Sequence, residues 1–95
     1  MTPKKIPTYS ILVFGKVQGV FYRASTKEKA TSLGLHGFVR NEPDGSVYII
    51  VQGHKKNIEA LVEWCRSGPS RAMVKDIIVN KIVWEHQYEN FTIDR

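Results

Sequence analysis

A glycine-flanked loop, GKVQGVFYR at residues 15–23, is the stretch of this sequence best suited to chemistry. It lies between an apolar run and a helical pattern, so its last residues would form a helix N-terminus. The first N–H groups of a helix have no internal partners, and the helix dipole there favours negative charge. Gly15 and Gly19 let consecutive N–H groups converge on a phosphate-sized anion, and the guanidinium of Arg23 can bind two oxygens at once. The stretch therefore fits an anion-binding loop.

The same residues also allow a purely structural interpretation. The glycines would then only make a turn, and Lys16 and Arg23 would be solvated charges. The loop matches neither a Walker A sequence, because Gly-Lys-Ser/Thr is missing, nor a dinucleotide-binding fingerprint. Taken alone, the stretch favours the structural interpretation.

The elements that must position this loop follow from the spacing of apolar residues. Short runs rich in β-branched and aromatic residues predict strands, and apolar residues three and four apart predict helices. EPDG, with its Pro and Asp-Gly, is typical of a hairpin turn, and an irregularity is expected near Asn80-Lys81. The predicted elements are a strand at 9–14, a helix at 21–33, strands at 35–41 and 46–53, a helix at 55–66, a strand-like region at 73–86 and a short strand at 91–95.

This β-α-β-β-α-β order predicts an α+β, ferredoxin-like split β-α-β sandwich, with one antiparallel sheet and two helices on one face. The strands ending near Gly15 and at Asn41 then run in the same direction, with the third strand between them. The loop and Asn41 would lie at the same edge, about 10 Å apart. An Asn before a turn is usually only a turn residue, but here its amide could hold a water in line with a bound phosphoryl group.

GKVQGVFYR followed by GFVRNEPDGSVYIIVQG resembles the acylphosphatases, small enzymes that hydrolyse acyl phosphates to a carboxylate and phosphate. The segment GPSRAMV is also similar, so the resemblance extends over nearly the whole chain from Tyr9. It implies that Arg23 grips the phosphate, that Asn41 orients the attacking water, and that neither a metal nor a cofactor takes part. The phosphate-binding loop that it implies consists of Gly15, Lys16, Val17, Gln18, Gly19 and Val20.

Two positions depart from the family pattern. Tyr22 stands where the family usually has Phe or Met, and the chain ends in IDR where many members end with an aromatic residue. Position 22 begins the core-facing stripe of the first helix, so we expect altered packing there and little change in chemistry.

The implied reaction requires few side chains. The leaving carboxylate has a conjugate-acid pKa of about 4, so it departs as an anion without a strong general acid. Phosphoryl transfer through a loose transition state mainly requires positioning and stabilisation of the equatorial oxygens. The water can pass its proton to the substrate's own phosphate oxygen.

The length, charge and cysteine content of the whole chain indicate its domain organisation, its compartment and its partners. Its 95 residues suit one domain at 9–95 behind a flexible lead-in at 1–8, and we expect a monomer. A net charge of +5 favours anionic partners, and the single Cys65 fits a reducing, cytoplasmic compartment. No apolar run is long enough to span a membrane, and the three His residues lack metal-ligand spacing.

Two other functions fit the same fold. RNA-recognition motifs share the element order and the basic charge, and HGFVRN partly matches their RNP1 sequence. However, the third strand offers only Tyr48 for base stacking, so we expect no nucleic-acid partner. A catalytically silent module that binds phosphate or a protein would be expected to lose Arg23 or Asn41, and both are present.

Overall fold

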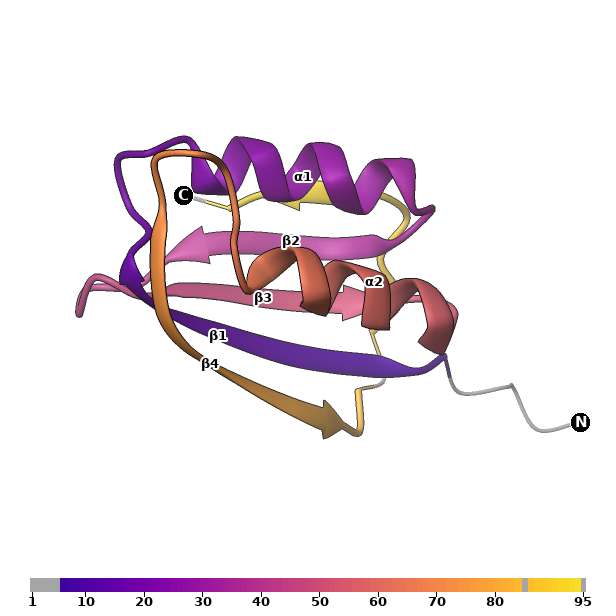
Figure 1. Cartoon of the computed structure of the whole chain (residues 1–95). Helices are drawn as coiled ribbons and strands as arrows, with labels where there is room; N and C mark the ends of the chain where they lie inside the picture. The colour runs from indigo at the N-terminus through magenta and orange to yellow at the C-terminus, as the bar shows by residue number, and fades with distance from the viewer. Residues whose placement is uncertain (1–5, 85, 95) are drawn as a thin grey trace, which may run out of the picture.

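A computed structural model describes residues 6–84 and 86–94. The elements follow the predicted order and end with a short fifth strand (Figure 1). They are β1 (Thr8–Lys16), α1 (Tyr22–Ser32), β2 (His36–Asn41), β3 (Val47–Gln52), α2 (Lys55–Cys65), β4 (Met73–Ile82) and β5 (Phe91–Ile93). Neither α1 nor α2 has the length and apolar composition that a membrane-crossing helix requires, and no other helix is found in the described ranges.

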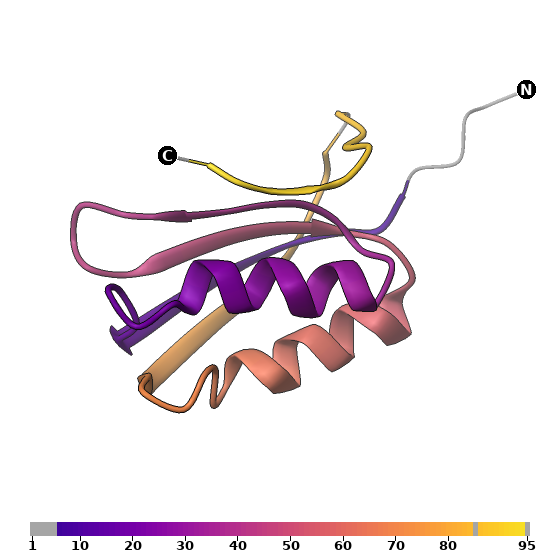
Figure 2. The same cartoon turned by 90° about the horizontal axis from the view of Figure 1, so that it is seen from above.

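The five strands form one sheet in the order β4-β1-β3-β2-β5, with both helices on the same face (Figure 2). This confirms the ferredoxin-like prediction, including the position of β3 between β1 and β2. The prediction of a wholly antiparallel sheet is wrong at one edge, because β5 pairs with β2 in parallel. The chain leaves β4 at the opposite edge of the sheet and comes back to β2 from the end where β2 begins, so β5 runs in the same direction as β2.

The core lies between the sheet and the helices. Alternate residues of the strands point inward, as a half-buried strand requires. β1 contributes Ile11 and Val13, and α2 contributes Ile58, Leu61 and Cys65 at helical spacing. These residues are fully or almost fully buried, so the sheet and the helices pack against each other through one apolar cluster.

The irregularity predicted near Asn80-Lys81 is wrong. β4 pairs with β1 in unbroken register there, and the register shifts between Phe14 and Gly15 instead. Gly15 has a φ of 125°, and a Cβ on it would lie 2.1 Å from the carbonyl oxygen of Met73. Glycine is therefore required where β1 bends against β4, and this long-range contact leaves no local signal in β4.

Strand and helix ends differ slightly from the prediction. Thr8, expected in the lead-in, is buried and already pairs with Gln52 as the first residue of β1. Of the rest of the predicted lead-in, residues 1–5 lie outside the described residues. Ile6 and Pro7 are described and belong to no helix or strand. β4 ends at Ile82, whereas we expected it to continue to residue 86.

Tyr22 packs in a way that a phenylalanine could only partly reproduce. Its ring is buried and lies 5.6 Å from the ring of Trp64, and its hydroxyl donates a 2.7 Å hydrogen bond to the carbonyl oxygen of Cys65. Cys65 is the last residue of α2, where carbonyl groups lack helical partners. The hydroxyl therefore joins the start of α1 to the end of α2.

We expect Tyr22→Phe to lower the free energy of unfolding by about 1–2 kcal/mol, because a buried carbonyl loses its partner. Urea unfolding of wild type and variant measures the difference. Tyr48→Phe is the matched control, because no described residue forms a hydrogen bond with its hydroxyl. Equal stability of wild type and Tyr22→Phe would contradict this role.

Burial of the Tyr22 and Cys65 side chains predicts how stability depends on pH. Burial raises the pKa of the Cys65 thiol from 9.0 to about 12, and burial also raises the pKa of the Tyr22 phenol. Raised pKa values in the folded state mean that unfolding releases protons once the pH exceeds the unfolded values. The free energy of unfolding should therefore fall as the pH rises from about 9 towards 12, and less steeply in Cys65→Ala. Urea titrations at several pH values test this, and identical slopes in both proteins would contradict it.

Candidate functional site

The loop between β1 and α1 is shorter than the sequence suggested. β1 extends to Lys16, so Gly15 and Lys16 lie in the strand, where they pair with Val74 and Met73 of β4. The connecting loop itself is formed by residues 17–21. The close approach of the Met73 backbone therefore requires glycine at position 15, whether or not Gly15 contacts an anion.

The loop and the first turn of α1 present a continuous run of free backbone donors. None of the N–H groups from Val17 to Ala24 donates a hydrogen bond to an acceptor within residues 6–84 and 86–94. The first internal bond of the helix runs from the Ser25 N–H to the Phe21 carbonyl oxygen. Free N–H groups at a helix N-terminus bind anions, because the donors and the helix dipole act together.

A cavity of about 300 Å³ opens at this loop. Asn41 from the end of β2 and Ile93 from β5 are part of its lining. The loop and α1 line the rest with Val17, Gly19, Phe21, Tyr22, Arg23 and Ala24. The structure thus brings Arg23 and Asn41 to one cavity, at the shared edge that the topology predicted.

The charge of this cavity is positive. Arg23 is the one charged residue in its lining, and no carboxylate of the described residues lies within ion-pair distance of the guanidinium. A guanidinium in a partly enclosed cavity favours a phosphate or carboxylate group, which it can bind through two parallel hydrogen bonds.

Asn41 carries an unsatisfied polar atom. Its side-chain oxygen Oδ1 is buried and has no hydrogen-bond partner among the described residues. Buried polar atoms are nearly always paired, so an orphan one indicates a place for a water or a ligand. Asn41 lines the same cavity as Gly19, Arg23 and Ala24, whose N–H groups donate to no acceptor among the described residues.

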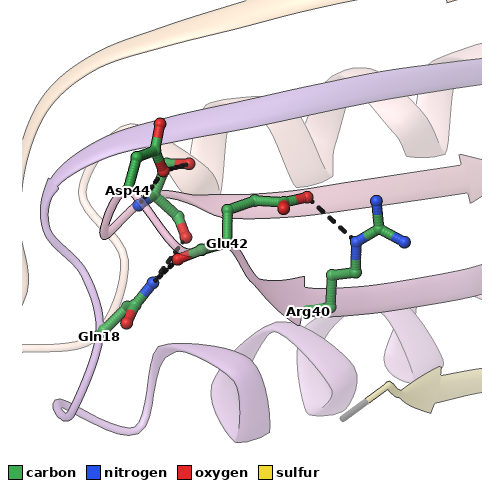
Figure 3. Close-up of polar contacts among 5 residues, drawn as sticks. Gln18, Arg40, Glu42 and Asp44 are labelled. Carbon is green, nitrogen blue, oxygen red and sulfur yellow. Dashed lines mark hydrogen bonds and ion pairs between the residues drawn. The ribbon is translucent and has the colours of Figure 1, made fainter.

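The remaining predicted loop residues divide into two groups. The side chains of Val17 and Val20 are buried in the core, so only their N–H groups can reach an anion. The side-chain amide of Gln18 is directed towards the turn between β2 and β3, where it donates to the carbonyl oxygens of Glu42 and Ser46 (Figure 3). Gln18 thus connects two parts of the site.

Phe21 and Ile93 line the cavity although the sequence did not point to them. Phe21 is 76% exposed and has a left-handed backbone, with φ 63° and ψ 23°. An exposed non-glycine residue in this conformation is strained, as is common at functional sites. Neither the strain nor the pairing of β5 with β2 leaves a local pattern in the sequence.

Comparison with known proteins places this architecture in a family. A sequence profile for acylphosphatases matches residues 9–93. An acylphosphatase of Marinobacter nauticus is 46% identical over 86 residues, which cover 90% of this chain and 94% of that protein. The structure of an acylphosphatase from Coxiella burnetii has a TM-score of 0.90 at 38% identity, covering 99% of this chain and 100% of that one. The Bacillus subtilis acylphosphatase structure also has a TM-score of 0.90, at 31% identity, covering 94% of this chain and 99% of that one.

Alanine substitutions should show which of the two glycines, Gly15 or Gly19, the fold requires. Gly15→Ala forces a Cβ into the backbone of Met73 and should lower the free energy of unfolding by about 3 kcal/mol or more. Gly19 has a φ of 73°, but a Cβ added there would meet open space, so Gly19→Ala should cost only about 1 kcal/mol. Urea unfolding of both variants measures this difference, and a Gly19→Ala loss as large as that of Gly15→Ala would contradict it.

Proposed function

The chain belongs to the acylphosphatase family and hydrolyses acyl phosphates, and we propose that the cavity between the loop, Arg23 and Asn41 is where it does so. The substrate is a small acyl phosphate, and the products are a carboxylate and inorganic phosphate. The observation that carries the proposal is the buried Oδ1 of Asn41, which has no hydrogen-bond partner among the described residues, in a residue that lines the same cavity as the loop.

In this proposal the loop binds the phosphoryl group. Its equatorial oxygens accept hydrogen bonds from N–H groups between Val17 and Ala24 and from the guanidinium of Arg23. These donors are fixed before the substrate arrives, so they need no reorganisation when negative charge shifts in the transition state. Gly15, Lys16 and Gln18, which the family resemblance also implied, contribute through the backbone or through the framework of the loop.

Asn41 positions the nucleophile. A water donates a hydrogen bond to Oδ1 of Asn41, which leaves a lone pair on the water oxygen directed at the phosphorus atom. A bond forms between the water oxygen and phosphorus as the bond from phosphorus to the acyl oxygen breaks. The carboxylate departs with the electron pair, and the proton of the water passes to a phosphate oxygen.

This chemistry requires neither a metal nor a cofactor, because the leaving group is stable as an anion. The donors already present supply the positive potential that a metal ion would otherwise provide. Within residues 6–84 and 86–94, no three His, Cys, Asp or Glu side chains gather as a metal site would require.

We further propose that residues 9–95 act as a single-domain monomer in the cytoplasm, without a nucleic-acid partner. The buried Cys65 has no disulfide, and the apolar core is formed by both helices and the sheet of one chain. On the sheet face opposite the helices, the guanidinium of Arg40 lies over the rings of Phe38 and Tyr48 and pairs with Glu42. These groups contact one another, which leaves them poorly placed to stack on bases.

Replacement of either site residue should remove most of the activity. We expect Arg23→Ala and Asn41→Ala each to reduce kcat/KM for benzoyl phosphate by about a hundredfold or more, as for the loss of an oxyanion-stabilising donor. Steady-state hydrolysis, with urea unfolding to confirm that each variant is folded, measures the effect.

Arg66→Ala and Asn80→Ala are the matched controls, since both residues are exposed and do not line the cavity. They should hydrolyse benzoyl phosphate at the wild-type rate. Near-normal turnover by folded Arg23→Ala and Asn41→Ala would refute the assignment of this site.

A further inference from the structure

The side-chain amide of Gln18 connects the anion-binding loop to the turn that follows Asn41 (Figure 3). Its Nε2 lies 2.8 Å from the carbonyl oxygen of Glu42 and 2.9 Å from that of Ser46. Both N–H bonds of the amide are therefore used, and both reach residues more than twenty positions away. No other side-chain hydrogen bond joins the loop to this turn within the described residues.

The two carbonyl groups belong to the framework of the turn. The Glu42 N–H donates to the Ser46 carbonyl oxygen at 2.8 Å, and the Gly45 N–H donates to the Glu42 carbonyl oxygen at 3.1 Å. The Asp44 carboxylate accepts hydrogen bonds from the N–H and the hydroxyl of Ser46. Gln18 thus binds a turn that is also held by its own hydrogen bonds, at the residue next to Asn41.

The sheet does not provide this connection. β1, which leads into the loop, and β2, which ends at Asn41, are separated by β3, so no ladder of hydrogen bonds joins them. A shift of about 1 Å between reacting groups can cost a hundredfold in rate. A direct bond between the loop and the turn is therefore the kind of contact that could fix the distance from the bound phosphoryl group to Asn41.

We propose that Gln18 is a positioning residue, which holds the Asn41 amide at its working distance from the phosphoryl group through the carbonyls of Glu42 and Ser46. The proposal rests on the proposed function, in which the loop binds the phosphoryl group and Asn41 orients the water. In this role the side-chain amide of Gln18 touches neither the substrate nor the water, because both of its N–H bonds are directed at the turn.

A double-mutant cycle tests this role. In the wild-type background, Gln18→Ala should lower kcat for benzoyl phosphate about tenfold and leave the inhibition constant of inorganic phosphate within about threefold, because the N–H donors remain. In the Asn41→Ala background, Gln18→Ala should not lower kcat further, since the residue through which it acts is gone. A merely structural role would lower kcat by the same factor in both backgrounds, and that result would overturn the proposal.

Gln52→Ala is the matched control. Gln52, which is buried, also joins distant segments through its side-chain amide, because its Nε2 donates to the His86 carbonyl oxygen at 2.6 Å and its Oε1 accepts from the Tyr88 N–H at 3.0 Å. Its bonds lie at the end of the sheet away from Asn41. It should lose stability like Gln18→Ala but keep the wild-type kcat, and an equal fall of kcat in the two variants would also overturn the proposal.

Gln18→Glu provides a second readout if Gln18→Ala does not fold. An ionised carboxylate has no donor and faces two carbonyl oxygens, whereas its protonated form regains one donor. The carbonyl oxygens disfavour the ionised form, so the pKa of this Glu rises above its ordinary value of about 4.3. Relative to wild type, kcat of the variant should rise as the pH falls through that pKa, and a constant ratio across pH would refute the proposal.

Each result can be attributed to one proposal. If wild type does not hydrolyse benzoyl phosphate, or if Asn41→Ala retains full activity, the proposed function fails. If Asn41→Ala is inactive but Gln18→Ala matches wild type, the proposed function stands and only the role of Gln18 fails.

Discussion

The position of β3 between β1 and β2 is the constraint on which the site depends. A right-handed β-α-β crossover keeps β1 and β2 parallel, so the two strands end at the same edge of the sheet. One intervening strand separates those ends by about 10 Å, and residues from both ends line a cavity of about 300 Å³. The loop, the start of α1 and Asn41 all contribute residues to this cavity.

The residues around this space include polar groups and a backbone conformation that would destabilise a hydrophobic core. Among the described residues, several N–H donors of the loop and the side-chain oxygen of Asn41 have no hydrogen-bond partner, and Phe21 has a left-handed backbone. Each of these features costs folding free energy. The apolar cluster between the sheet and the helices and the Tyr22–Cys65 contact offset that cost. Val17 and Tyr22 belong both to this cluster and to the cavity lining, so the same residues stabilise the fold and shape the cavity.

Sequence reasoning succeeded where a signal was local or followed from topology. The donor loop and Arg23 are adjacent in the chain, and the element order was enough to place Asn41 beside them. It failed where the cause was a partner far away in the sequence. Gly15 is glycine because of the backbone of Met73, and Gln18 faces the carbonyl groups of a distant turn. The three-residue β5 is too short to show any periodicity from which its direction could be predicted.

The pairing of β5 with β2 has a consequence for folding. The cavity is lined from the loop, from the end of β2 and from the last described strand, so no short segment of the chain contains it. A site assembled from such distant contacts forms only when the chain has closed its long loops, which is the slow part of folding. A nascent chain that still lacks β5 would already display the loop sequence but would lack one wall of the cavity. The cavity is therefore complete only late in folding, once β5 has paired with β2.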